Sequence, residues 1–149
     1  MESQRHALLT LICVPVLLAG CGTTTGGREL GVPQDGVRHE GAGFVITGRA
    51  LEDGPGNLLE TLVGKIPNFR IQRNSGGCPI IHLRGAVGLQ GNPHVYVDGT
   101  RTAGTCVLTS LRTVDVSRIE VYPMGFTTRP GYGTHAHGLI LVFMRSAGG

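Results

Sequence analysis

The sequence predicts an α+β domain made of a small mixed β-sheet and two short helices. Residues 94–98 and 116–122 alternate apolar and polar side chains, with the two-residue period of half-buried strands. Residues 58–66 and 107–113 instead carry apolar side chains at the spacing of a helical stripe. Residues 139–144 are apolar throughout, so we expect a strand that is central in the sheet or covered on both faces.

Three further strands are expected upstream of these. The domain opens with an alternating strand that begins at Phe44. Residues 69–73 alternate in the same way, and Phe69 and Ile71 should point toward the core. The apolar run at residues 79–85 gives the third strand, and glycine-rich loops follow both later segments.

The first helix is expected over residues 58–66. Its apolar stripe consists of Leu58, Leu59, Leu62, Val63 and Ile66. Asn57 precedes the stripe and can cap the helix, because its side-chain oxygen accepts a hydrogen bond from a free backbone N–H. Pro67 ends the helix. Asn68 follows, and Asn is among the non-glycine residues that best tolerate a left-handed backbone.

The segment between residues 94 and 122 predicts strand, turn, short helix and strand. Asp98-Gly99 forms the turn, because Gly adopts positive φ without steric cost. Thr105 is placed to cap the second helix. The stripe of that helix consists of Val107, Leu108, Leu111 and Val114. In the following strand, Ser117, Ile119 and Val121 alternate against Arg118, Glu120 and Tyr122, and Pro123 ends the run.

In their order along the chain, these motifs resemble the plug domain of TonB-dependent outer-membrane receptors. The matching motifs are Val97-Asp98-Gly99, Asp115, Arg118-Ile119-Glu120-Val121, Tyr132-Gly133 and Gly138-Leu139-Ile140-Leu141-Val142. Upstream, residues 58–73 resemble the helix, turn and strand of the family, and Leu83-Arg84-Gly85 resembles its strand ending in Arg-Gly. The resemblance spans residues 44 to 145 and implies a plug-like fold.

Residues 1–20 have the pattern of a secretory signal peptide, with a weakly positive start, an uncharged apolar core and small residues after it. The core is too short to span a bilayer, which needs about 20 apolar residues. Leu18-Ala19-Gly20-Cys21 resembles the lipobox of bacterial lipoproteins. This implies that Cys21 carries acyl chains such as palmitate and becomes the first mature residue. The alternative is an ordinary cleavage site beside an unrelated cysteine.

A lipidated Cys21 would anchor the protein to a membrane, since each buried CH₂ of an acyl chain contributes about 0.8 kcal/mol. Gly22 follows it, and by resemblance to lipoprotein sorting a residue other than Asp allows export to the outer membrane. Residues 21–43 are rich in Gly and Thr and predict a flexible tether. Residues 44–145 then form the plug-like domain, and residues 146–149 form a tail.

The cysteines fit an exported protein. Cys13 leaves with the signal peptide and Cys21 is the lipid site, so Cys78 and Cys106 remain in the folded region. Two thiols in an oxidising compartment, outside a Cys-x-x-Cys arrangement, favour a disulfide over a redox pair. We therefore predict a Cys78–Cys106 disulfide.

The charge distribution argues against a nucleic-acid partner. The chain has a formal net charge of +3 at pH 7 and 5% aromatic residues, and its basic residues are scattered. Nucleic-acid binding calls for clustered cations, with aromatics where single strands are stacked. The mild positive charge can still favour anionic surfaces.

We expect neither an enzyme nor a cofactor. The sequence contains no nucleophile elbow, phosphate loop or metal-ligand run of the usual spacing. Ser75, Ser110 and Ser117 have no spacing that pairs any of them with a histidine.

His135 and His137 would present two imidazoles on one side of an extended segment, and imidazole binds transition metals well. A metal site needs further ligands, which only His82 or His94 could supply. We expect a polar loop here and no metal.

Arg84, Asp98 and Glu120 lie at or near strand ends, where they form either one shared network or separate solvated charges. In the receptor family the arginine of the Arg-Gly motif, here Arg84, faces the barrel wall with a second arginine after the Glu-Val strand. Residues 122–125 contain no arginine. This departure argues against ordinary docking inside a barrel.

A receptor barrel of about 22 strands, at about 10 residues each, needs roughly 220 residues. The 149-residue chain is therefore expected to be a plug without its pore, and residues 21–43 contain no TonB-binding box that we can identify. Two functions stay open. One is a binding or accessory module for an outer-membrane barrel or another envelope protein. The other is a structural surface lipoprotein that uses the plug-like fold only as a scaffold.

For a binding module, the expected contacts lie on the glycine-rich loops at residues 85–92 and 125–138 and on exposed arginines. Those arginines are Arg84, Arg101 and Arg129. Glycine-rich loops suit this role because a missing Cβ lets the backbone approach a partner closely.

Overall fold

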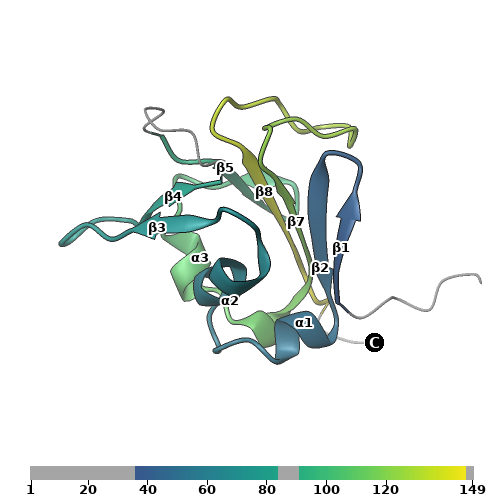
Figure 1. Ribbon diagram of the computed structural model, residues 1–149, viewed down its shortest axis with the longest axis horizontal. Helices are drawn as coiled ribbons and strands as arrows, with labels where there is room; N and C mark the ends of the chain where they lie inside the picture. Colours follow the sequence, from purple (N-terminus) through teal and green to yellow (C-terminus); the bar gives the residue numbers. More distant parts are fainter. Residues whose placement is uncertain (1–35, 84–90, 147–149) are drawn as a thin grey trace, which may run out of the picture. The chain divides into compact units, whose positions relative to one another are not determined.

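The larger of the two sheets has six strands in the order β1-β2-β7-β8-β5-β6 (Figure 1), in a computed structural model that describes residues 36–83 and 91–146. The strands are β1 (Gly36–Glu40), β2 (Gly43–Thr47), β5 (His94–Val97), β6 (Thr100–Arg101), β7 (Val116–Tyr122) and β8 (Leu139–Met144). Neighbouring strands are antiparallel except β5 and β8, which are parallel. The predicted mixed sheet is confirmed.

Short helices cover one face of this sheet (Figure 1). They are α1 (Arg49–Glu52), α2 (Leu58–Lys65), α3 (Val107–Ser110) and the 3₁₀ helix η1 (Thr113–Asp115). The main core lies between the two layers and includes Ile46, Leu58, Leu62, Leu108, Ile119, Ile140 and Val142. The opposite face of the six-stranded sheet, which we call the open face, carries a second cluster formed by Tyr96, Tyr122, Leu139 and Leu141.

The α2 helix begins as predicted. The Oδ1 atom of Asn57 accepts a hydrogen bond of 2.9 Å from the Glu60 N–H, so the first turn is capped. Leu58 and Leu62 are fully buried. Val63 instead has 42% of its surface exposed, so its assignment to the apolar stripe was wrong.

Two turns adopt the left-handed backbone that their residues favour. Asn68, after the helix-ending Pro67, has φ 60°. Asp98 and Gly99 have φ 46° and 82° and join β5 to β6 as a two-residue hairpin. Such hairpins need positive φ at both turn positions, which explains the Asp-Gly sequence.

The β8 strand is central, as its uniformly apolar sequence predicted. It lies between β7 and β5. Leu139, Ile140, Leu141 and Val142 are each at most 1% exposed. Alternate side chains enter the two clusters, so both faces of this strand are covered.

The structure corrects the predicted sheet in two places. Residues 36–40, predicted to belong to the tether, form β1 and pair with β2 from Gly36 opposite Thr47 to Glu40 opposite Gly43. The strands β3 (Arg70–Gln72) and β4 (Ile80–His82) were predicted to join the main sheet but form a separate two-stranded sheet. Phe69 and Ile71 still point toward the main core, as expected.

The second helix is shorter than predicted and is capped differently. It ends at Ser110, and Val114 is exposed instead of completing its stripe. The hydroxyl of Thr105 does not cap it but donates a hydrogen bond to the Pro79 carbonyl oxygen. In β7, a bulge at Ser117 interrupts the predicted alternation, so Val116 takes the place in the core and Ser117 is exposed.

Candidate functional site

A fully buried carboxylate, that of Glu120, lies on the open face of the sheet. The Arg129 guanidinium donates two hydrogen bonds of 2.6 Å to this carboxylate, from Nε to Oε2 and from Nη2 to Oε1. The Tyr122 hydroxyl donates a third, 2.8 Å long, to Oε2. A bidentate charge-assisted pair of this kind is among the strongest polar contacts in proteins, and it offsets the cost of burying the charge.

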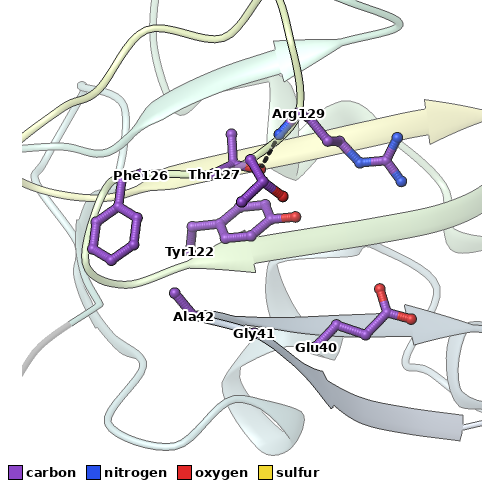
Figure 2. A pocket seen from close by; sticks show the side chains of 8 residues that line it. Glu40, Gly41, Ala42, Tyr122, Phe126, Thr127 and Arg129 are labelled. Carbon is purple, nitrogen blue, oxygen red and sulfur yellow. Dashed lines mark hydrogen bonds between the residues drawn. The ribbon is translucent and has the colours of Figure 1, made fainter.

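The local fold explains how these groups meet. Glu120 and Tyr122 are two residues apart on β7 and therefore share a face. After β7 the chain turns back over this face, which brings the Arg129 side chain into contact with Glu120. The Arg129 N–H also donates a 3.1 Å hydrogen bond to Thr127 Oγ1 (Figure 2). The contact between Glu120 and Arg129 therefore fixes the loop at residues 123–138 to the sheet.

The ion pairs continue toward the sheet edge. Arg118 Nε lies 2.5 Å from Glu120 Oε1, without the alignment of a hydrogen bond, and Arg118 Nη2 lies 3.1 Å from Glu40 Oε2. Glu40 in turn pairs with Arg38 at 3.1 Å. Three arginines thus share two glutamates, which leaves the network with an excess positive charge.

Tyr122 and Arg129 both keep their protons near neutral pH. Burial raises the pKa of the Tyr122 hydroxyl, and the hydrogen bond and negative charge of Glu120 act in the same direction, against the hydrogen bond from Thr127. The hydrogen bond to Glu120 raises the pKa of Arg129. Tyr122 therefore stays a donor and Arg129 stays a cation, which suits a fixed structural clamp better than proton transfer.

A pocket of about 410 Å³ opens beside Tyr122 and Arg129. Its lining residues are Glu40, Gly41, Ala42, Tyr122, Phe126, Thr127, Thr128 and Arg129 (Figure 2). Phe126 is 47% exposed, and the nearby Met124 is 52% exposed. The loop therefore presents two large apolar side chains to solvent, and one of them, Phe126, lines the cavity.

A histidine group occupies the start of β5. The His94 ring stacks on His135 with centroids 3.4 Å apart, and the rings of His135 and His137 are 5.3 Å apart. His82 and His94 were the candidates for a third imidazole, and His94 contacts His135. Across residues 36–83 and 91–146, no group of three or more His, Cys, Asp or Glu side chains has an arrangement that could hold a metal ion.

Residues 28–138 match the family model described as TonB-dependent Receptor Plug Domain. The chain belongs to this plug-domain family. The predicted resemblance is confirmed over most of the sequence. No curated protein matches the chain significantly.

Three solved structures share the plug fold of this chain. They are the RagAB peptide importer in its closed-closed state, the ferric enterobactin receptor PfeA in complex with BCV-L6, and the copper transporter OprC. The TM-scores are 0.51, 0.52 and 0.51, at sequence identities of 22%, 20% and 17%. The matches cover 73%, 74% and 76% of this chain but only 13%, 18% and 18% of those chains.

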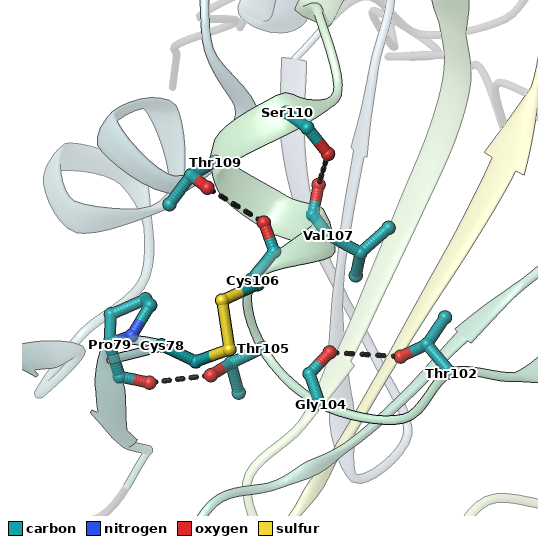
Figure 3. Close-up of a disulfide and its surroundings, with 9 residues drawn as sticks. All are labelled: Cys78, Pro79, Thr102, Gly104, Thr105, Cys106, Val107, Thr109 and Ser110. Atoms are coloured by element: carbon teal, nitrogen blue, oxygen red, sulfur yellow. Dashed lines mark hydrogen bonds between the residues drawn. A yellow bond between two sulfur atoms is a disulfide. The ribbon is translucent and has the colours of Figure 1, made fainter. Parts of the chain in front are cut away.

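The plug domain is tied together by the predicted Cys78–Cys106 disulfide, which is present (Figure 3). It links the segment before β4 to the first turn of α3. Next to it, Thr105 Oγ1 donates a 2.5 Å hydrogen bond to the Pro79 carbonyl oxygen. These two links fasten the small sheet to the layer of helices. None of the helices in the described part of the plug domain is long and apolar enough to cross a membrane.

The predicted site residues fall in different places. Cys21 and Arg84 lie outside the described residues. Arg101 is exposed on β6, and its Nη2 atom lies 2.6 Å from His94 Nε2. Arg129 is engaged with Glu120, so its charge serves the plug domain itself. Whether these arginines contact a partner stays a prediction.

Arg84, Asp98 and Glu120 were expected to form either one shared network or separate solvated charges, and of these Asp98 and Glu120 have different partners. Asp98 Oδ1 instead accepts a 2.9 Å hydrogen bond from the Met144 N–H. Sequence reasoning missed the partners Arg118 and Arg129. The available signal was in β7, where Arg118 and Glu120 flank Ile119 and Glu120 shares a sheet face with Tyr122. A carboxylate on a sheet face that becomes covered needs a counter-ion.

Proposed function

We propose that this chain is a cell-envelope lipoprotein whose plug domain acts by binding, as an accessory module for an outer-membrane partner, and that it is not an enzyme. The observation that carries the proposal is the exposed side chain of Phe126, which lines the pocket on the open face, with the exposed Met124 two residues before it. Exposed apolar groups next to a cavity, rimmed by polar residues, are typical of interaction sites.

The fixed loop makes this surface suitable for recognition. Arg129 holds the loop to the buried Glu120, and the Gly125 N–H donates a 3.0 Å hydrogen bond to the Tyr122 carbonyl oxygen at its start. Because the loop is already ordered, little conformational entropy remains to be lost when a partner binds. Met124 and Phe126 can then contribute most of their burial to affinity.

The partner we propose is an outer-membrane barrel protein of an uptake system. Family membership supports this, because plug domains are parts of TonB-dependent receptors. The similar structures are described as a peptide importer, a receptor for ferric enterobactin and a copper transporter. The resemblance also supports a location in the cell envelope.

Photo-crosslinking tests the binding role. A crosslinking amino acid replaces Phe126 in one variant and Val63 in the other, since the two side chains are similarly exposed at 47% and 42%. Val63 lies on α2, whereas Phe126 lines the pocket on the open face. We expect the Phe126 variant to form an adduct with an outer-membrane barrel protein in native envelopes and the Val63 variant to form none.

The alternative function predicts a different outcome. If the plug fold serves only as a scaffold of a structural lipoprotein, neither variant should give a defined adduct. A second measurement uses Phe126→Ser, which should weaken recovery of the identified barrel protein at least about tenfold, since it removes a large apolar side chain that the partner would bury. Recovery equal to that of Val63→Ser would contradict the proposal.

Lipidation of Cys21 is tested separately. The motif Leu18-Ala19-Gly20-Cys21 supports it. Cys21→Ser should abolish incorporation of labelled palmitate and move the protein from the membrane to the soluble fraction. Cys13→Ser, a change in the segment upstream of the motif, is the control and should leave both unchanged. If the Cys21 variant still fractionates with membranes, another segment anchors the protein.

A further inference from the structure

Four basic side chains gather at one end of the open face, and the binding role proposed for Met124 and Phe126 does not depend on them. His94 begins β5 and Arg101 ends β6. His135 and His137 lie in the loop before β8. The His94 ring is stacked on His135 at 3.4 Å, and the Arg101 guanidinium is 2.6 Å from His94 Nε2. We call these four residues the basic cluster.

The backbone holds this cluster in place. The His94 N–H donates a 3.0 Å hydrogen bond to the Gly138 carbonyl oxygen, which aligns β5 with the start of β8. The His135 N–H donates a 2.8 Å hydrogen bond to the Gly125 carbonyl oxygen. A Cβ on Gly125 would lie 1.7 Å from the His135 carbonyl oxygen. Only glycine therefore allows the loop to lie this close, and the imidazoles are positioned before any ligand arrives.

Among the described residues, no carboxylate forms an ion pair with the cluster. Burial lowers the pKa of His94, and the charges of His135, Arg101 and His137 lower it further. Burial and the charges of His137 and Arg101 likewise lower the pKa of His135, against a hydrogen bond to the Gly138 backbone, which raises it. The acid nearest in sequence is Asp98, whose Oδ1 atom accepts the Met144 N–H.

The cluster also holds an unpaired polar atom. His135 Nδ1 is buried and has no hydrogen-bond partner among the described residues. Buried polar atoms in native proteins almost always have a partner, so an orphan calls for a missing one. A protonated imidazole would need an acceptor at this atom.

The chemistry of the cluster favours a ligand with a negative charge. A metal cation needs free imidazole lone pairs, but the Arg101 guanidinium lies against His94 Nε2 and adds a fixed positive charge. An oxyanion instead accepts hydrogen bonds from a guanidinium and from protonated imidazoles. We propose that His94, Arg101, His135 and His137 form a site for an oxyanion, either a carboxylate or a phosphate or sulfate group.

Binding at this site is coupled to proton uptake. At neutral pH the two histidines with lowered pKa are mostly neutral, and Arg101 supplies the positive charge. A bound anion favours their protonated forms and raises the pKa of both. By linkage, the affinity must rise as the pH falls, by up to about tenfold per pH unit for each proton taken up.

The test is an NMR titration of the histidine rings in the full chain purified in neutral detergent. Sulfate is the probe, because its charge is constant between pH 5.5 and 7.5. We expect saturable upward shifts in the pKa of His94 and His135, and affinity at least about tenfold higher at pH 5.5 than at pH 7.5. Arg101→Gln should weaken binding about tenfold, whereas Arg70→Gln, an exposed arginine of β3, should not.

Micelles with and without phosphatidylglycerol distinguish a free anion from a lipid headgroup. Resonance shifts of the same histidines on adding this lipid, lost in Arg101→Gln and competed by sulfate, would assign the site to a headgroup. A response to sulfate alone would assign it to a soluble oxyanion. The proposal is overturned if sulfate leaves both pKa values unchanged, if Arg70→Gln weakens binding as much as Arg101→Gln, or if Zn²⁺ binds tightly where sulfate does not.

Discussion

Replacing Arg129 by methionine should destabilise the plug domain far more than the loss of an ordinary surface charge. Glu120 is fully buried, and Arg129 supplies two of its hydrogen bonds. The Arg129 side chain is itself 40% exposed. The cost therefore arises at the carboxylate, which loses its bidentate counter-ion and two hydrogen bonds.

The magnitude follows from what remains around Glu120. Removing one partner of a buried ion pair costs about 3–5 kcal/mol, because it leaves an uncompensated charge. Arg118 and Tyr122 stay in contact with the carboxylate. We therefore take the lower end and expect Arg129→Met to reduce the free energy of unfolding by about 3 kcal/mol.

Urea unfolding followed by far-ultraviolet circular dichroism measures this loss. The control is Arg73→Met, which removes an exposed ion pair with Glu60 and should cost less than about 1 kcal/mol. Adding Glu120→Gln to Arg129→Met removes the stranded charge and should recover at least about half of the loss. If Arg129→Met costs no more than Arg73→Met, the carboxylate is not held by this pair and the reasoning fails.

Three further outcomes are expected. Cys78→Ser/Cys106→Ser should lose about 3.5 kcal/mol of unfolding free energy, because the disulfide closes a loop of 28 residues; two reactive thiols per chain in the unfolded, unreduced protein would contradict the bond. Burial lowers the pKa of His135, so the unfolded state binds its proton first and stability should fall as the pH drops below about 6.5. A His135→Leu variant should flatten that pH dependence, and an unchanged slope would exclude this histidine as its source. Gly125→Ala should cost more than about 2 kcal/mol, because φ is 73° and the new Cβ would lie 1.7 Å from a carbonyl oxygen; Gly133→Ala, with open space around the new Cβ, should change stability by less than about 0.5 kcal/mol, and equal losses would refute the packing argument.

The elements that could be predicted are those with local signals. The Asn57 cap, the leucine stripe and Pro67 lie within one short stretch, and together they define α2. The Asp98-Gly99 turn likewise follows from the backbone preferences of two adjacent residues. The family resemblance added the order of the elements but not their contacts.

Strand partnership could not be predicted in the same way. The alternation in residues 69–73 predicts a strand but does not identify the strand that pairs with it. Backbone N–H and C=O groups form the same hydrogen bonds with any neighbouring strand. The β3 strand pairs only with β4. Residues 36–40 were missed because β1 begins with Gly36 and is followed by Gly41 in a glycine-rich stretch, and Val37 is its only apolar residue besides the glycine.

The candidate site depended on contacts between distant positions. Glu120 alternates with Ile119 and Val121, as a solvated residue on a half-buried strand would. Its burial arises from the loop that folds over the open face, and nothing in the local sequence reports that return. The stacking of His94 on His135 has the same origin, since it requires β5 to lie parallel to β8.

The place of β8 in the sheet sets the order in which the domain can assemble during synthesis. Among the strands of the sheet it is the last in sequence, yet it joins β1-β2-β7 on one side to β5-β6 on the other. Until residues 139–144 are available, β7 and β5 are open edges with unpaired backbone groups, which are prone to pair with other chains. A growing chain therefore cannot complete this sheet in stages, and protection from aggregation must last until the joining strand has emerged.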